Sequence, residues 1–156
     1  MGLHNNMRTE TVSALNLREP ILAKADETLR VAVQRMREKQ FGCVFVVDEG
    51  DKPIGAFSES LLNRLLVTNP KALDDPLRRH MSDYWCCVKL TDPIIKVLTA
   101  MQSRNVRFVC VLDDQGRAVA LTGQKGLMEY IADHYPAQVM AQRIGCSPFT
   151  QQREGA

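Results

Sequence analysis

Two hydroxyl residues, Ser58 and Thr122, stand where a short apolar, strand-like run gives way to a helical pattern. A hydroxyl at such a junction usually caps the helix by accepting a hydrogen bond from a backbone N–H group. The junction also suits a phosphate, because free N–H groups and the helix dipole favour negative charge. Lys125 follows Thr122 closely and adds a positive point charge. Both interpretations, helix cap and anion contact, stay open.

The other reactive side chains do not form a recognisable catalytic or metal-binding pattern. No nucleophile stands near a base, and no paired acid and base is evident. The five cysteines include no CxxC or Cys/His spacing, and Cys43 and Cys110 lie inside apolar runs typical of buried strands. We therefore expect a protein that is not an enzyme, holds no metal and requires no cofactor.

Charge and hydropathy exclude further classes of function. The formal net charge of the 156-residue chain is +2, with Lys and Arg scattered along it. This is too weak a bias to predict binding to nucleic acid or to an anionic membrane surface. No apolar run approaches the roughly 20 residues of a spanning helix, and the start of the chain lacks the apolar core of a secretory signal. We expect a cytoplasmic protein.

The elements that must position the two hydroxyls occur twice. Gly42–Leu62 reads as strand, turn, strand and the start of a helix, and Arg107–Leu127 repeats that layout. A short extended piece and a helix precede each copy, so each repeat has the order β-α-β-β-α. Two repeats packed through their sheets would share a core.

The spacing between the copies fixes a register. Met101 follows Met36 by 65 residues, whereas Thr122 follows Ser58 by 64. With Thr122 as the counterpart of Ser58, this spacing predicts that the second copy has lost one residue in its β-turn, where a deletion is best tolerated.

The repeats divide the chain into a lead-in, two repeats, a linker and a tail. The spacing predicts helices from Thr28 and over Glu59–Val67, and another that starts with Asp92 as N-cap and Pro93 at the first helical position. The lead-in reads as frayed chain or a short strand, and the linker has enough apolar residues to pack on the surface. The predicted bounds are 1–17, 18–69, 70–83, 84–135 and 136–156.

This repeated order resembles a tandem pair of cystathionine-β-synthase (CBS) domains, a Bateman module, over about residues 18–135. The matching segments are Ala25–Leu29 with Leu90–Ile94, Phe45–Asp48 with Cys110–Asp113, and Gly55–Ser58 followed by Leu61-Leu62. The resemblance implies an α+β (α/β) fold of two β-α-β-β-α repeats related by a pseudo-twofold axis. It also implies a homodimer and a regulatory role in which clefts between the repeats bind AMP, ADP, ATP or S-adenosylmethionine.

The family's signature, Gly-apolar-apolar-Ser/Thr-x-x-Asp, implies which residues contact a ligand. The Asp, which holds the ribose, is replaced by Leu61 after Ser58 and by Lys125 after Thr122, and Val119 replaces the Gly of the second copy. Phosphate contacts are therefore expected to outweigh ribose contacts. The implied ligand-binding residues are Thr122, Lys125, Arg107 and Ser58, with Leu22, Ala23 and Val88 either lining an adenine slot or serving as ordinary strand residues.

Two functions from different classes remain. One is a sensor that binds a nucleotide and is read by an unknown protein partner. The other is an interaction or dimerisation module whose clefts have lost ligand binding, as the absent Asp pair suggests. In the tail, Val139, Met140 and Ile144 have helical spacing, which would be explained by packing on a second subunit.

Overall fold

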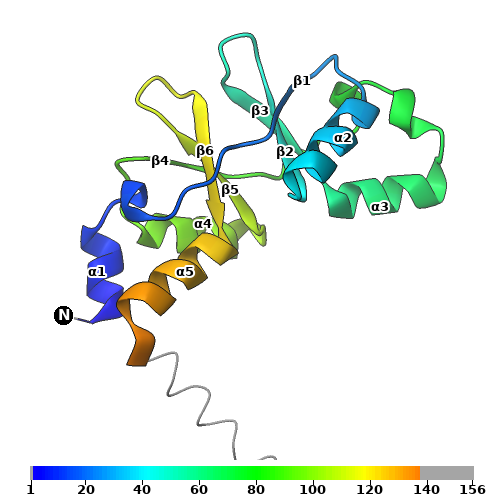
Figure 1. Ribbon diagram of the computed structural model, residues 1–156. Helices are drawn as coiled ribbons and strands as arrows, with labels where there is room; N and C mark the ends of the chain where they lie inside the picture. The colour runs from blue at the N-terminus through cyan, green and yellow to red at the C-terminus, as the bar shows by residue number, and fades with distance from the viewer. Residues whose placement is uncertain (1, 138–156) are drawn as a thin grey trace, which may run out of the picture.

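The computed structural model describes residues 2–137. The first repeat comprises β1 (Leu22–Lys24), α2 (Leu29–Lys39), β2 (Cys43–Val47), β3 (Pro53–Ser58) and α3 (Glu59–Thr68). The second comprises β4 (Cys87–Lys89), α4 (Ile95–Arg104), β5 (Phe108–Leu112), β6 (Ala118–Gly123) and α5 (Gln124–His134). The predicted order β-α-β-β-α is confirmed in both repeats, and Figure 1 shows them side by side.

Each repeat forms a three-stranded mixed sheet. The order is β1-β2-β3 in the first and β4-β5-β6 in the second. The first two strands of each sheet are parallel and the last two antiparallel. The central strands, CVFVV and FVCVL, are nearly continuous apolar runs, as expected for strands covered on both faces.

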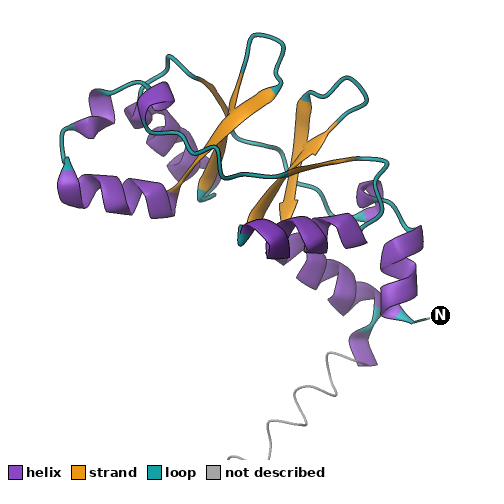
Figure 2. Ribbon diagram, turned by 180° about the vertical axis from the view of Figure 1, so that it is seen from behind, coloured by secondary structure: helices purple, strands orange, loops and turns teal. Residues whose placement is uncertain are grey.

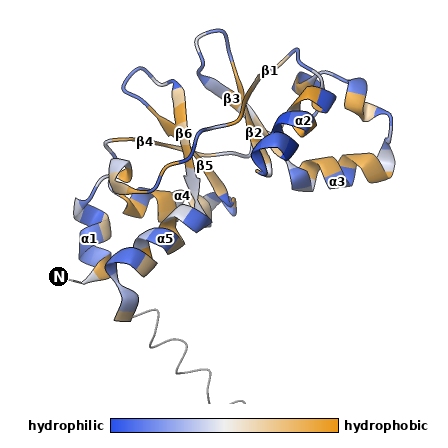
Figure 3. Ribbon diagram, viewed as in Figure 1, coloured by the Kyte–Doolittle hydropathy of each residue, from blue (hydrophilic) through white to orange (hydrophobic). Residues whose placement is uncertain are grey.

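Alternate residues of these strands fill two kinds of core. One set faces the helices of its own repeat, as Val44 and Val109 do. The other set, including Phe45, Cys110 and Leu121, forms a shared cluster between the sheets. Figure 2 shows the strands in the middle of the molecule and helices on both outer sides, and Figure 3 shows polar hairpin loops beyond the apolar strands. The predicted α+β fold, with the repeats packed through their sheets, is confirmed.

The two hairpins have the same length, so the predicted deletion in the second turn is wrong. Cys43 pairs with Ser58, and Phe108 pairs with Gly123, which places both members of the second pair 65 residues after the first. Gly123 is therefore the counterpart of Ser58, and Thr122 is not. Residue type suggested the wrong alignment, because the second copy carries its hydroxyl one position earlier.

The lead-in is helical, which corrects the expectation of frayed chain or a short strand. It forms α1 (Leu3–Thr9) and a 3₁₀ turn, η1 (Val12–Ala14). Met7 and Val12 are buried in the core of the second repeat. The Val12 N–H group donates to the Asp92 carbonyl at 2.8 Å. Buried apolar contacts therefore stabilise a segment whose own sequence pattern is weak.

The predicted helix starts hold at two of three places. Thr28 caps α2, accepting from the Val31 N–H group. Asp92 does not cap α4, because its carboxylate accepts from the Lys89 N–H group at 2.8 Å and from Lys96 Nζ at 2.6 Å. No side chain caps α4, which begins at Ile95.

The linker packs on the surface as predicted. It contains two 3₁₀ turns, η2 (Ala72–Asp74) and η3 (Leu77–Arg79), and Leu77 is fully buried against the first repeat. Within residues 2–137, no helix is both long enough and apolar enough to cross a bilayer.

Candidate functional site

Two connecting segments cross between the repeats and create two related clefts. Residues 16–18 lie along β6, where Arg18 and Leu121 exchange backbone hydrogen bonds of 3.0 and 2.8 Å. Residues 81–83 lie along β3, where Ser82 and Ala56 exchange bonds of 2.7 and 3.0 Å. Each strand-to-helix junction therefore lies near a segment that leads into the other half of the chain.

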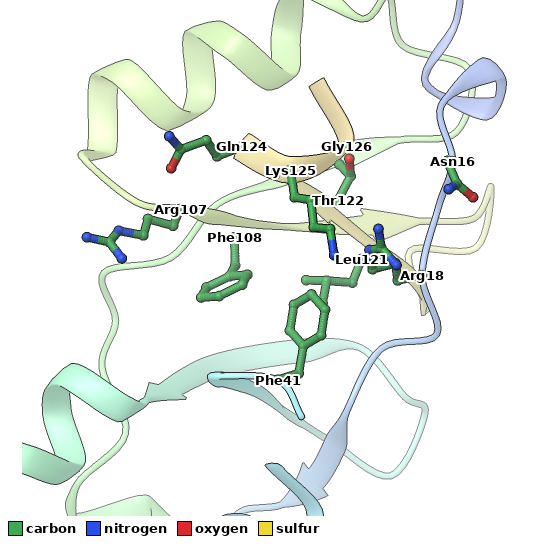
Figure 4. A pocket seen from close by; sticks show the side chains of 11 residues that line it. Asn16, Arg18, Phe41, Arg107, Phe108, Leu121, Thr122, Gln124, Lys125 and Gly126 are labelled. Carbon is green, nitrogen blue, oxygen red and sulfur yellow. The ribbon is translucent and has the colours of Figure 1, made fainter. Parts of the chain in front are cut away.

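The second cleft contains a small cavity of about 30 Å³. Its lining includes Arg18, Phe41, Phe108 and the strand-to-helix junction from Leu121 to Gly126 (Figure 4). A cavity of this size can hold a water molecule, whereas sites for drug-sized ligands usually measure about 300–1,000 Å³. A nucleotide would enter this cleft only if the lining side chains moved.

The rim of this cavity is positively charged. Arg107 and Lys125 line it, both are exposed, and neither forms an ion pair with any of residues 2–137. Arg18 pairs with Glu129 at 2.6 Å and is thereby neutralised. In Figure 4 the Lys125 side chain runs toward Arg18, whereas Arg107 extends away from Phe41. Lys125 is therefore the better placed of the two free cations to meet an anion.

Thr122 is buried and does not cap α5. Its side chain is 5% exposed, and its Oγ1 atom has no hydrogen-bond partner among the described residues. The hydroxyl lies against Gly126, where an added Cβ would come within 2.6 Å of it. A polar atom buried without a partner costs stability, so Thr122 stands out as a group that a ligand could satisfy.

Gly123 occupies the N-cap position of α5, and no side chain caps this helix. A Cβ on Gly123 would lie 2.0 Å from the Arg107 carbonyl oxygen, so the close approach of the two backbones requires glycine here. The Gln124 N–H group donates to that same oxygen at 3.2 Å. Without a side-chain cap, other N–H groups of the first turn are available for an anion.

The first cleft differs, because the hydroxyl at its strand-to-helix junction has a protein partner. Ser58 caps α3 by accepting from the Leu61 N–H group at 3.4 Å. Met81 packs on Gly55, with Sδ 2.8 Å from the place of an added Cβ. Leu61 packs on the core of the first repeat. The position of Ser58 therefore agrees with the ordinary helix-cap interpretation.

The residues proposed for an adenine slot do not join Thr122. Leu22 and Ala23 line a separate hollow of about 350 Å³ with Glu27 and Arg35. The Arg35 guanidinium donates to Glu27 at 2.6 and 2.9 Å and lowers the pKa of that carboxyl. Val88 is buried in the core of the second repeat. The structure thus brings together Thr122, Lys125 and Arg107, and leaves the other predicted residues elsewhere.

Several residues that line the cavity were not predicted from the sequence. Asn16 and Arg18 come from the lead-in region. Phe41 precedes β2, and its ring centroid lies 5.3 Å from that of Phe108, with the two ring planes tilted by 56°. The position of Phe41, an aromatic residue just before a predicted strand, could have indicated that it lines a cleft. Nothing in the local pattern marks Arg18, whose place depends on the crossing of the chain between the repeats.

Among residues 2–137, Cys43 and Cys110 are buried in the sheet core, Cys86 is half-buried and Cys87 is exposed. Burial raises the pKa of Cys43 and of Cys110 to about 12. Among residues 2–137, no three His, Cys, Asp or Glu side chains are grouped so that they could hold a metal ion.

Comparison with known proteins identifies the family. The model for the CBS domain matches residues 12–67. The structure of Staphylococcus aureus OpuCA is 30% identical, with a TM-score of 0.60, over 75% of this chain and 96% of that chain. The chain belongs to the CBS-domain family.

Two further proteins extend the comparison. The glycine betaine/carnitine/choline transport ATP-binding protein OpuCA of Bacillus subtilis is 26% identical over 80% of this chain and 31% of its own length. A CBS domain protein of Pyrobaculum aerophilum, solved in complex with AMP, has a TM-score of 0.66 at 22% identity over 73% of this chain and 87% of that chain. The chain spans less than two thirds of the length of the curated relatives it matches.

Proposed function

We propose that this CBS pair is a non-catalytic regulatory module that binds an adenosine nucleotide, or a related phosphate-bearing ligand, in its second cleft. The observation that carries the proposal is the buried hydroxyl of Thr122, which has no partner among residues 2–137 and lies beside the uncapped start of α5. Lys125 and Arg107, which form no ion pair within residues 2–137, supply positive charge at the rim. The AMP complex of the Pyrobaculum protein supports an adenosine nucleotide as the class of ligand.

The second cleft favours phosphate contacts over ribose contacts. In the observed register Gly126 is the counterpart of Leu61, so neither repeat offers a carboxylate at the position that holds the ribose in this family. Leaving a ribose hydroxyl unpaired costs on the order of 1–3 kcal/mol. We therefore expect ADP and ATP to bind more tightly than AMP, and adenosine to bind weakly.

Ligand binding would act through a shift in population. The 30 Å³ cavity is too small for a nucleotide, so the bound state requires residues 16–18 to separate from the start of α5. Residues 16–18 pair with β6 of the second repeat and lead directly into the first repeat, so they link the second cleft to both repeats. A partner that contacts either repeat would sense this displacement, because the ligand stabilises one arrangement over the other.

The second candidate is an interaction or dimerisation module with degenerate clefts. The Met81 side chain that packs on Gly55 in the first cleft favours this candidate, as does the small size of the cavity in the second cleft. Helix α3, none of whose residues is fully buried, offers an apolar surface for a homodimer contact (Figure 3).

Thermal unfolding with and without ligand distinguishes the two candidates. AMP, ADP, ATP or S-adenosylmethionine at millimolar concentration should raise the midpoint, since a ligand at 100 times its Kd stabilises the native state by about 2.7 kcal/mol. Lys125→Gln should reduce the shift caused by ATP. Lys71→Gln, which removes an exposed charge from the linker, should leave it unchanged. If no ligand shifts the midpoint and no nucleotide copurifies, the interaction module is the better description.

A further inference from the structure

Four cysteines gather where the second sheet faces the first. Cys43 belongs to β2 and Cys110 to β5, and both are buried in the cluster that the two sheets share. Cys87 begins β4, and Cys86 directly precedes it. All four are free thiols. Burial, and then the thiols of Cys87, Cys43 and Cys86 in that order, raise the pKa of Cys110 to about 12, so Cys110 has thiol neighbours from both repeats.

Cys87 and Cys110 are direct partners in the parallel pairing of β4 with β5. Neighbouring strands of a sheet lie about 4.8 Å apart. A disulfide requires a separation of about 4.4–6.8 Å between its two Cα atoms. Residues in register also project their side chains from the same face of the sheet. The two thiols are therefore neighbours at a separation that a disulfide can bridge.

The first repeat shows which face this is. Leu22 and Phe45, 65 residues before Cys87 and Cys110, are partners in the same register. Phe45 is buried in the cluster between the sheets, and Leu22 packs against that cluster. The fold therefore accepts two ordinary apolar side chains at these positions, and packing alone does not require a pair of thiols there.

The two thiols differ in access to solvent. Cys87 is exposed, whereas Cys110 is 0% exposed. A small molecule in solution can therefore reach the sulfur of Cys87, and Cys110 can react only with a sulfur that its neighbour already carries. An accessible thiol beside a second, resolving thiol is the usual arrangement of a redox-sensitive cysteine pair.

The other two cysteines are less suited to pair with Cys87. Cys86 packs against the core on the opposite face of the second sheet, and its Sγ donates to the Phe108 carbonyl at 3.9 Å. Cys43 is buried in β2 of the other sheet, so no strand pairing holds it beside Cys87. Cys110 is the one described cysteine that the pairing of the strands places directly opposite Cys87.

We propose that Cys87 and Cys110 form a thiol-modification site at which a low-molecular-weight disulfide oxidises the pair to an internal disulfide. The Cys87 thiolate attacks one sulfur of the small disulfide, forms a mixed disulfide and releases one small thiolate. The Cys110 thiolate then attacks the Cys87 sulfur, and the second small thiolate leaves. Two protein thiols are oxidised, one small disulfide is reduced to two thiols, and the protons of Cys87 and Cys110 pass to these products.

Mass spectrometry after incubation with glutathione disulfide tests the proposal. The incubation is run at pH 9, because burial raises the pKa of both thiols and the thiolate is the reacting form. The wild type should yield peptides joined through Cys87 and Cys110, with glutathione lost from Cys87. Cys110→Ser should retain glutathione on Cys87, and Cys87→Ser should take up none at Cys110. Cys86→Ser, the matched control, should behave like the wild type.

Peptide mapping assigns each modification to its cysteine. It separates the reaction of Cys146, which belongs to the tail, whose predicted helical stripe lies outside the described residues. Circular dichroism before oxidation checks that each variant is folded, and Cys110→Ala replaces Cys110→Ser if the buried hydroxyl prevents folding.

Three results would overturn the proposal. Equal retention of glutathione on Cys87 in the wild type and in the folded Cys110 variant would mean that Cys110 does not resolve the mixed disulfide. A bond from Cys87 to Cys86 or Cys43 would assign the site to another pair. Absence of any modification at Cys87 in both proteins would mean that the small disulfide does not reach this thiol.

Discussion

Replacing Thr122 with valine should make the ligand-free protein more stable. Valine has nearly the shape of threonine and removes the hydroxyl that has no partner among the described residues. Leaving a buried polar group unsatisfied costs about 1–3 kcal/mol. For a chain of this size, each kcal/mol raises the unfolding midpoint by about 3 °C, so Thr122→Val should gain about 3–9 °C.

The assay is thermal unfolding of matched variants without added ligand. Thr122→Ser keeps the hydroxyl and removes a methyl group, so it should lower the midpoint. Ser58→Ala removes a real cap from α3 and should cost about 1 kcal/mol. The two residues that sequence alone made equivalent should therefore respond with opposite signs.

A lower midpoint for Thr122→Val would refute this reasoning. It would mean that the hydroxyl has a partner in solution, and a water in the adjacent 30 Å³ cavity is the simplest one. If a ligand satisfies the hydroxyl, the stabilised variant should also show a smaller thermal shift with ATP than the wild type. Removal of the Thr122 hydroxyl would then raise the stability of the ligand-free protein and weaken the binding of ATP.

Three further predictions follow from the packing. Gly123→Ser should destabilise the protein by about 1–3 kcal/mol in denaturant unfolding, because its Cβ would clash with the Arg107 carbonyl oxygen; an unchanged midpoint would contradict the assigned close approach. Arg35 lowers the pKa of Glu27 from 4.5, so the stability that this pair contributes is present above pH 4.5 and is lost as the pH falls through the lowered value. The difference in midpoint between wild type and Arg35→Gln should therefore shrink on acidification, and a constant difference would oppose the assignment. Iodoacetamide should label the exposed Cys87 before the two buried thiols of the sheet core, which peptide mapping by mass spectrometry would reveal.

The repeat architecture was predictable because its signals are local. Continuous apolar runs such as Cys43–Val47 predict buried strands, and the threonine before α2 predicts its start. The second occurrence of the whole order confirms the assignment of each element. These features depend on neighbouring residues, which the sequence displays directly.

The site was less predictable, because it depends on contacts between distant residues. Thr122 matches the expected residue type, but strand pairing puts Gly123 at the N-cap. The choice of glycine there depends on the Arg107 carbonyl, and the place of Arg18 depends on a crossing segment. Asp92 failed as a cap because nearby partners, Lys89 and Lys96, occupy its carboxylate.

The crossing segments also decide what a single repeat could do alone. Residues 16–18, which precede the first repeat, pair with β6 of the second. Residues 81–83, which precede the second repeat, pair with β3 of the first. Each sheet therefore receives a strand-like edge from the segment that leads into the other repeat. A fragment that contains one repeat and the segment that precedes it would carry an edge segment without a sheet to accept it. Two such fragments could satisfy each other by exchanging these segments. The fold is therefore one in which a single chain supplies to itself the segments that two separate repeats would have to exchange.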